Sequence, residues 1–376
     1  MMPSVSHRLC SGRIFALAVA LLASAARGQE IPPNPPPIPT DTSKLPHVVI
    51  VSMGGTIASR GVPRLNITHY GGKGVPRVEP EDWVHDLPEL ATIARVTTED
   101  CRPPMGASAS ETNGDMRKVA KLLNRLAQDP TVDGMVVTHG TNTMAEVAFY
   151  VNLVVKSEKP IVFVGSQRPW SGLSGDGPLN LFNAVRVAAT PAAWRLGVLH
   201  CMNQDINTAR DVTKTSAYRV QTFKAIDVGP IGFADPDKVV FYREPTRKHT
   251  YKSEFAGMDF AYLPPVEVFY AYTEAPGYLI DAAVEHGVKG LVIDGTGAGS
   301  ATPSENEAIK RAQALGVVVV MTTRTRGGRV QEVPQRTESK IVNGDNLPPE
   351  KARILLQLAL TQTNDWKEVK RYFDEY

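Results

Sequence analysis

The stretch GMVVTHGTNTMAE (134–146) passes from an apolar run through a polar turn into helix-forming residues. Its first residues are typical of a strand that is buried on both faces of a sheet. Thr143-Met144-Ala145-Glu146 matches a capping box, in which the threonine and glutamate side chains bond free N–H groups at a helix start. This interpretation leaves Thr141 and Asn142 in the turn, beside the positive end of the helix dipole, where anions are attracted.

The same alternation of strand and helix continues along the chain. Before residue 243 we expect strands at 48–52, 133–138, 160–165 and 196–202, and helices at 116–128, 143–156 and 178–189. After residue 265 we expect strands at 266–272, 290–294 and 316–322, and helices at 277–286, 303–315 and 348–361. Continuous Val/Ile strands separated by helices indicate an α/β fold whose parallel sheet is covered on both faces.

A polar, irregular stretch that ends in a double proline lies between these two series of elements. Such a stretch is typical of a linker. We therefore predict a larger N-terminal domain at 47–243, a linker at 244–265 and a smaller C-terminal α/β domain at 266–376.

The first 46 residues predict an export signal followed by a tether. Basic residues precede the apolar run 14–23 and small residues follow it, so we expect a signal peptide at 1–28. The proline-rich stretch 29–46 lacks apolar periodicity and is expected to be an extended tether. An uncleaved anchor is the alternative, although the apolar run is short for a membrane span. The prediction is a periplasmic or secreted protein with no membrane contact after cleavage.

Composition excludes several other classes of protein. The 376 residues are 42% hydrophobic and 21% charged, which are globular values. The formal charge of +2, without a basic tract that contains aromatics, argues against nucleic acid as a partner. No cluster of Cys and His has the spacing of a metal site, so no metal is expected. Cys101 and Cys201 would remain after cleavage, either as a disulfide or as two buried free thiols.

Polar clusters follow three of the expected strands, where the carboxyl edge of a parallel sheet gathers functional groups. Gly54-Gly55-Thr56 is either a tight turn or a close approach to a ligand that leaves the Thr56 hydroxyl free. In the turn that contains Thr141, we interpret His139 as a packed residue. The loop 209–215 is either a solvated charge cluster or the source of a lysine, Lys214, whose pKa burial lowers.

Other catalytic patterns are missing from the sequence. There is no Gly-x-Ser-x-Gly elbow, cysteine nucleophile motif or paired-carboxylate pattern, and DGTGAGS (294–300) lacks the spacing of a dinucleotide site. Two threonine hydroxyls and one lysine remain, and they suit nucleophilic attack on a small acyl centre.

Two segments, MGGTIAS (53–59) and VVTHGTNTM (136–144), together resemble the signature segments of bacterial-type L-asparaginases. The likeness covers residues 47–376 in the expected order and continues through KPIVFVGSQRP (159–169), GDGPLNLFNAV (175–185), RDVTKT (210–215), TRKHT (246–250) and PPEKARILLQLALTQTND (348–365). The resemblance implies a two-domain asparaginase-like fold whose larger N-terminal domain has flavodoxin-like character. It also implies an exported homotetramer with sites at dimer interfaces and no metal or organic cofactor.

By the same resemblance, Thr56 matches the nucleophile that accepts the acyl group. Thr141 and Lys214 match the second hydroxyl–amine pair of the site. Tyr70 matches the tyrosine of a mobile lid, and Glu332 is the counterpart of the acid that supports this tyrosine.

Substrate-binding residues are implied in the same way. Ser108 matches the serine that holds the α-carboxylate of the substrate, with Ser110 as the alternative. Ser300 matches a serine that reaches the site of a neighbouring subunit. Asn142 departs from the family, which usually has an aspartate there to receive the α-ammonium, whereas Ala145, where many members have glutamate, is expected to matter little.

The resemblance implies hydrolysis of L-asparagine to L-aspartate and ammonia through a threonine acyl-enzyme. The neutral side chain of Asn142 keeps open a glutaminase-asparaginase or an amidohydrolase for another small amide, with L-glutamine as a possible substrate. A non-catalytic amino-acid-binding protein on the same scaffold is a third hypothesis.

Overall fold

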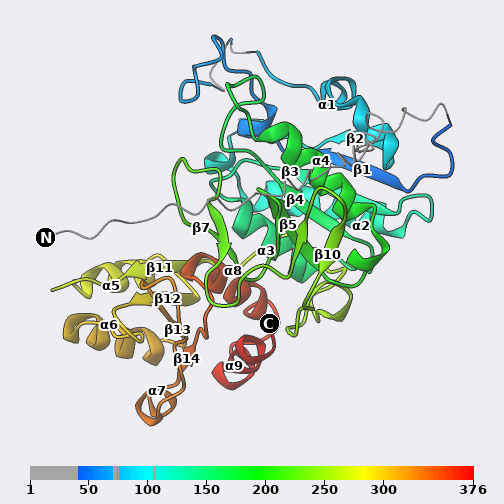
Figure 1. Cartoon of the computed structure of the whole chain (residues 1–376). Coiled ribbons are helices and arrows are strands. Elements are labelled where there is room, and N and C mark those ends of the chain that lie inside the picture. Colours follow the sequence, from blue (N-terminus) through cyan, green and yellow to red (C-terminus); the bar gives the residue numbers. More distant parts are fainter. Residues whose placement is uncertain (1–40, 71–73, 75, 105–106) are drawn as a thin grey trace, which may run out of the picture. The chain divides into compact units, whose positions relative to one another are not determined.

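Two sheets with helices packed against them form the framework of the chain in the computed structural model (Figure 1). The structure describes residues 41–70, 74, 76–104 and 107–376, which all belong to one compact unit. The signal peptide predicted at 1–28 and the tether up to residue 40 lie outside the described residues.

The larger sheet has the strand order β10-β9-β6-β5-β4-β3-β1-β2. Its strands are β1 (His47–Ser52), β2 (Arg95–Asp100), β3 (Gly134–Thr138), β4 (Ile161–Val164), β5 (Val198–Met202), β6 (Asp205–Thr208), β9 (Gly232–Ala234) and β10 (Val239–Phe241). From β2 to β5 all neighbours are parallel, and β6, β9 and β10 add an antiparallel edge. Strands β1, β3, β4 and β5 are buried along their whole lengths, as expected for a sheet covered on both faces.

Helices and short elements connect and cover these strands. They are α1 (Pro80–Asp86), α2 (Asn113–Gln128), α3 (Met144–Val154), α4 (Gly177–Ala188), the 3-10 turns η1 (Thr56–Ala58), η2 (Pro88–Thr92), η3 (Ser108–Ser110) and η4 (Pro191–Ala193), and the strand pair β7 (Val212–Lys214) and β8 (Phe223–Ala225). None of the helices in the described ranges is both long and apolar enough to cross a membrane.

The smaller sheet is parallel throughout, in the order β11-β12-β13-β14. Its elements, with the preceding 3-10 turn η5 (Thr250–Lys252), are β11 (Val266–Tyr270), α5 (Tyr278–Glu285), β12 (Gly290–Gly295), α6 (Pro303–Ala314), β13 (Val318–Thr323), α7 (Pro334–Glu338), β14 (Ile341–Asn343), α8 (Pro349–Ala359) and α9 (Trp366–Glu375). Alternate residues of β12 and β13 belong to two hydrophobic clusters, because successive side chains of a strand point to opposite faces. One cluster includes buried residues of α8 and the other includes those of α5 and α6.

The predicted alternation of strands and helices is therefore confirmed, and the element ends agree to within about three residues of the expected ranges. The sequence prediction missed β2, β7, β8 and β14, the antiparallel edge β6, β9 and β10, and the helices α1, α7 and α9. Each of the antiparallel strands has only three or four residues, too few for a hydrophobic period to stand out.

Candidate active site

The candidate site lies where the order of the larger sheet reverses. Strand β2 lies on one side of β1, and β3, β4 and β5 follow on the other side. In open α/β sheets, ligands bind outside the carboxyl ends of the strands at such a switch point. Ser52 and Thr138 are opposite each other in register, so the turns after β1 and β3 leave the sheet at the same level.

These two turns touch through glycine backbones. Gly55 has φ = 88°, and a Cβ atom there would lie 2.3 Å from the Cα of Gly140. A Cβ atom on Gly140 would lie 2.5 Å from the hydroxyl of Ser108. A side chain at Gly55 would force the two turns apart, and one at Gly140 would displace Ser108. The sequence predicted a tight turn or a close approach to a ligand at Gly55, not this contact with a second turn.

The first turn carries Thr56, which begins η1. Its hydroxyl oxygen lies 3.1 Å from the phenolic oxygen of Tyr70, within hydrogen-bond distance. Both side chains are half-buried and line the same cavity. The contact links the residue predicted as the nucleophile to the residue predicted as the lid tyrosine.

The second turn carries Thr141, which is buried. The Nζ atom of Lys214 donates to its hydroxyl oxygen at 2.8 Å, and this hydroxyl lies 3.4 Å from the amide oxygen of Gln167. Burial lowers the pKa of Lys214 below its usual value, because the charged ammonium loses water there. The arrangement can therefore hold a lysine that gives up its proton more readily than one in water.

The two turns, together with Ser108 from η3, line one cavity of about 480 Å³. Its described lining comprises Gly55, Thr56, Ser59, Ile67, Thr68, Tyr70, Ala107, Ser108, Gly140, Thr141, Asn142, Gln167, Lys214, Ala217 and Tyr218. Among these described residues, Lys214 alone carries a formal charge. Ser108 is buried against the cavity, whereas Ser110 is exposed and lies outside this lining.

Two predicted residues lie outside this cavity within the chain. Glu332 is exposed and contacts Thr337 and Lys370, at 3.1 and 3.3 Å. Ser300 is also exposed, in a short bridge with Thr296. Their assignments stay predictions that require a neighbouring chain.

The predicted capping box is wrong. Thr143 is the N-cap residue of α3, but its hydroxyl oxygen lies 3.0 Å from the carbonyl oxygen of Ser108 and 2.8 Å from the Glu111 carboxylate, and its one proton is shared between these acceptors. These tertiary partners replace the local cap, and Thr143 thereby links the second turn to the Ser108 segment.

His139 is buried, which agrees with its interpretation as a packed residue, and its Nδ1 atom lies 2.8 Å from the carbonyl oxygen of Gly140.

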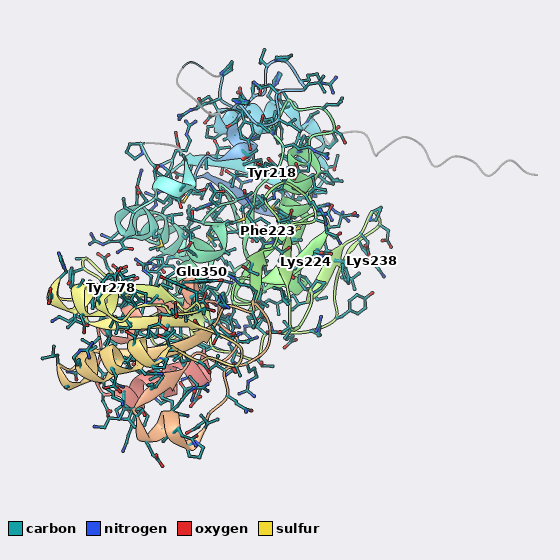
Figure 2. All side chains as sticks on the ribbon, turned by 90° about the vertical axis from the view of Figure 1, so that its left-hand side faces the viewer. Tyr218, Phe223, Lys224, Lys238, Tyr278 and Glu350 are labelled. Atoms are coloured by element: carbon teal, nitrogen blue, oxygen red, sulfur yellow. The ribbon has the colours of Figure 1, made fainter. Side chains whose placement is uncertain are left out.

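Sequence reasoning missed Gln167 and Tyr218. Gln167 bonds Thr141 and donates to the carbonyl oxygens of Ser216 and Arg219, so it links β4 to the loop after Lys214. Its signals were its place after a buried strand and within KPIVFVGSQRP (159–169), one of the segments that carry the resemblance. Tyr218 lies on that loop before β8 and is 80% exposed at the cavity rim (Figure 2).

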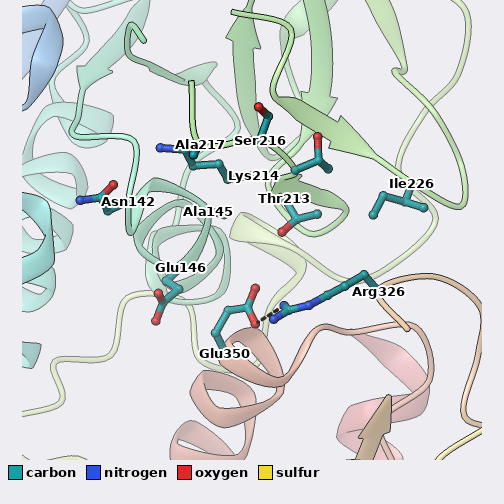
Figure 3. Close-up of a pocket in the computed structure, with 11 residues that line it drawn as sticks. Asn142, Ala145, Glu146, Thr213, Lys214, Ser216, Ala217, Ile226, Arg326 and Glu350 are labelled. Carbon is teal, nitrogen blue, oxygen red and sulfur yellow. Dashed lines mark hydrogen bonds and ion pairs between the residues drawn. The ribbon is translucent and has the colours of Figure 1, made fainter. Parts of the chain in front are cut away.

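A second cavity, of about 680 Å³, adjoins the first and shares Asn142, Lys214 and Ala217 with it. Asn142 and Lys214 lie at one end, and the ion pair of Arg326 with Glu350 lies at the other (Figure 3).

Cys101 and Cys201 are both buried free thiols, so the disulfide alternative is wrong. In the described part of the chain, no group of three or more His, Cys, Asp or Glu side chains is arranged to hold a metal ion.

Comparison with known families agrees with this architecture. The family model described as "Asparaginase, N-terminal" matches residues 47–247, and the model described as "Glutaminase/Asparaginase C-terminal domain" matches residues 265–373. The chain belongs to the asparaginase family.

Individual asparaginases are similar over most of their lengths. L-asparaginase 2 of Bacillus subtilis (strain 168) is 41% identical over 340 residues, which cover 90% of this chain and 88% of the relative. A probable periplasmic L-asparaginase of Haemophilus influenzae is 38% identical over 89% of this chain and 95% of the relative. The crystal structure of a probable cytoplasmic L-asparaginase from Campylobacter jejuni has a TM-score of 0.81 and 32% identity, covering 88% of this chain and 100% of that one. Family membership and the two-domain asparaginase fold predicted from the sequence are therefore confirmed.

Proposed function

We propose that this chain hydrolyses the side-chain amide of L-asparagine to L-aspartate and ammonia through an acyl-enzyme on Thr56. The observation that carries the proposal is the convergence of the Thr56–Tyr70 and Thr141–Lys214 contacts on one cavity at the switch point of the sheet. Membership of the asparaginase family and the names of its relatives support the same reaction.

In the proposed reaction, the Thr56 hydroxyl oxygen bonds to the side-chain amide carbon. The hydroxyl proton passes to the leaving nitrogen, and the carbon–nitrogen bond breaks to release ammonia. Tyr70 accepts and relays this proton through its hydrogen bond to Thr56. Water then attacks the acyl-enzyme, the Thr141–Lys214 pair assists its deprotonation, and aspartate leaves as Thr56 regains its proton.

Ser108 and Asn142 are proposed to bind the α-carboxylate and α-ammonium of the substrate. Glu332 and Ser300 are proposed to act in the site of a neighbouring chain, within a homotetramer whose sites lie at dimer interfaces. These assignments follow from the family resemblance and need no metal or organic cofactor.

Ammonia release by the purified chain, with the variants Thr56→Ala and Thr56→Ser, tests the nucleophile. We expect Thr56→Ala to lose at least about a thousandfold in kcat, because no hydroxyl remains to form the acyl-enzyme, and Thr56→Ser to keep measurable turnover. Full activity of folded Thr56→Ala would refute the assignment. Binding of asparagine without any turnover by the unmodified chain would favour the binding-protein hypothesis.

A glutaminase-asparaginase is the second candidate, and the description of the C-terminal family model includes both activities. The neutral Asn142 in the cavity lining also favours relaxed recognition of the α-amino group. Comparison of kcat/KM for asparagine, glutamine and succinamic acid, which is asparagine without its α-amino group, separates these candidates. Equal values for asparagine and glutamine would favour the dual activity.

Export to the periplasm or medium is also proposed, because residues 1–28 have the pattern of a cleavable signal peptide. The similarity to a probable periplasmic relative supports export. The similar crystal structure is named as a cytoplasmic enzyme, so family membership by itself does not decide between the two locations. N-terminal sequencing of the mature protein should begin at Gln29. A mature chain that retains Met1 would contradict this proposal.

A further inference from the structure

Lys351, in the first turn of α8, is a fully buried charged side chain that the proposed reaction does not use. Its Nζ atom donates to the carbonyl oxygens of Ala209 and Arg210, both at 2.8 Å, and of Val212 at 2.5 Å. An ammonium group has three N–H donors and no acceptor, so these three carbonyls satisfy it completely. Lysine is almost never fully buried unless its ammonium has such partners, so these three bonds explain how Lys351 can be buried.

Two of the three carbonyls belong to the turn that leads into β7 and the third, of Val212, to the first residue of that strand, which ends at Lys214. Their oxygen atoms would otherwise be buried without partners, which proteins avoid. Val212 is only two residues from Lys214, so a shift of this turn moves the amine that bonds Thr141.

The same ammonium also lies beside α3, the helix that follows the second turn of the site. It lies 5.8 Å from the centre of the Phe149 ring, within the range of a cation–π contact. Phe149 is on α3, the helix that begins just after Thr141. Lys351 therefore touches both the segment that ends at Lys214 and the helix that follows Thr141.

We propose that Lys351 is a positioning residue that holds the turn at 209–212 against α3 and thereby sets the Thr141–Lys214 contact. Its effect on catalysis rests on the proposed function, whereas its effect on the surroundings of Lys214 does not.

Other charged groups near these lysines must be distinguished from the carbonyl contacts. Burial lowers the pKa of Lys351 to about 8, while the carboxylates of Asp211, Glu350 and Glu146 raise it and Arg210 lowers it further. The second cavity brings Glu146, Glu350 and Arg326 to the side of Lys214. An experiment that changes Lys351 must therefore separate the loss of its bonds from the loss of its charge.

Lys351→Met removes the three donors and keeps a side chain of similar length. We expect the freed carbonyls to draw in water, amide hydrogen exchange across 209–214 to accelerate, and the pKa of Lys214 to move up toward its ordinary value. Because small misplacements of catalytic groups are costly, kcat should fall by roughly tenfold to a hundredfold, with a smaller change in KM.

The matched control is Gln357→Met on the same helix. Gln357 is also buried, and its side-chain amide donates to the carbonyl oxygen of Pro264 at 3.2 Å, outside the 209–212 turn. We expect this variant to lower the unfolding temperature without changing exchange at 209–214 or the pKa of Lys214. Lys351→Arg, which keeps donors and charge, should recover part of the kcat that Lys351→Met loses.

The readouts are the pH dependence of kcat/KM, hydrogen exchange by mass spectrometry, and the pH dependence of Lys214 acetylation by acetic anhydride. Acetylation needs no turnover, so it tests the positioning role even if the unmodified chain releases no ammonia and the proposed function fails. Should Lys351→Met not fold, Lys351→Gln, which keeps two N–H donors, serves in its place with a smaller shift expected. Unchanged exchange at 209–214, or a Lys214 pKa shift without faster exchange, would overturn the proposal.

Discussion

Asn142 is an uncharged amide in a cavity whose described lining contains no carboxylate. An amide oxygen can accept a hydrogen bond from an α-ammonium, but it supplies no negative charge, so this position should bind the ammonium more weakly than a carboxylate would. If Asn142 binds the α-ammonium as proposed, the amide in place of a carboxylate affects substrate affinity more than the reaction class, because the proposed catalytic residues Thr56, Thr141 and Lys214 are all present.

Asn142→Asp should strengthen asparagine binding by about 1–3 kcal/mol, a roughly 5- to 150-fold decrease in KM. The kcat value should change less, because the substitution leaves the hydroxyl–amine pair intact. Succinamic acid is the matched control, since it has no α-ammonium to gain from the new charge. An equal gain for both substrates, or no gain for asparagine, would contradict the charge argument.

The role proposed for Lys214 predicts that the reaction depends on pH. Burial lowers its pKa, so the neutral amine that accepts a proton becomes populated at a lower pH than for a lysine in water. We expect kcat/KM to rise with pH through this lowered pKa and to level off above it. The pH profile of Lys214→Arg should lack this rise, because arginine stays protonated. A profile that does not depend on residue 214 would exclude lysine as the group that titrates.

At the scale of elements, the site is made by the contact between the turns after β1 and β3. Each turn was expected from the sequence, because a strand followed by glycine and threonine has a local pattern. The partner of Thr143 was not, because its hydroxyl bonds Ser108 and Glu111, which lie more than 30 residues earlier in the chain. Local motifs therefore predicted where α3 begins but not which bonds hold its start.

Gly55→Ala tests the contact between the turns. Gly287→Ala is the control for a positive φ without a collision, because Gly287 has φ = 85° against 88° and a Cβ atom added there would meet no atom within 4 Å. Gly55 also has ψ = −168°, a conformation that is essentially restricted to glycine and adds strain of its own. The control should cost only the strain of the left-handed backbone, about 1–2 kcal/mol in free energy of unfolding. Gly55→Ala should cost more and should also reduce kcat, since its Cβ would collide with Gly140. Equal losses of stability in chemical denaturation, with full activity of both variants, would contradict this account.

At the scale of the whole molecule, contacts between residues far apart connect the two domains. Arg210 is only 8% exposed and bonds Asp211, Asp345, Asn346 and the carbonyl oxygen of Tyr376. The solvated-cluster interpretation of the loop 209–215 is therefore wrong for Arg210. Apart from the adjacent Asp211, its partners lie more than 130 residues later in the chain, where no local pattern could reveal them.

The positions of Glu332 and Ser300 lead to a prediction about assembly. If Glu332 acts in a neighbouring site, Thr56→Ala and Glu332→Ala chains should each be inactive alone. Refolded together in equal amounts, they should regain about a quarter of the unmodified activity, because half of the pairs are mixed and each mixed pair has one complete site. Ammonia release before and after mixing measures this. No recovery, in mixtures shown by mass spectrometry to contain mixed oligomers, would place Glu332 outside the site.

The sequence by itself determined the alternating α/β elements, the two-domain asparaginase fold and the candidate residues Thr56, Thr141 and Lys214. These depend on hydrophobic period, glycine-rich turns and ordered motifs, which are local properties of the chain. The resemblance implied that Tyr70 bonds Thr56 and that Lys214 pairs with Thr141, and the structure has both contacts. Only the tertiary structure decided that Gln167 lies beside Thr141, that Thr143 bonds the Ser108 segment and that Lys351 bonds the turn before Lys214. It also left Glu332 and Ser300 outside the cavity of their own chain. Such contacts join residues remote in sequence, and burial and geometry, not neighbouring residues, select them.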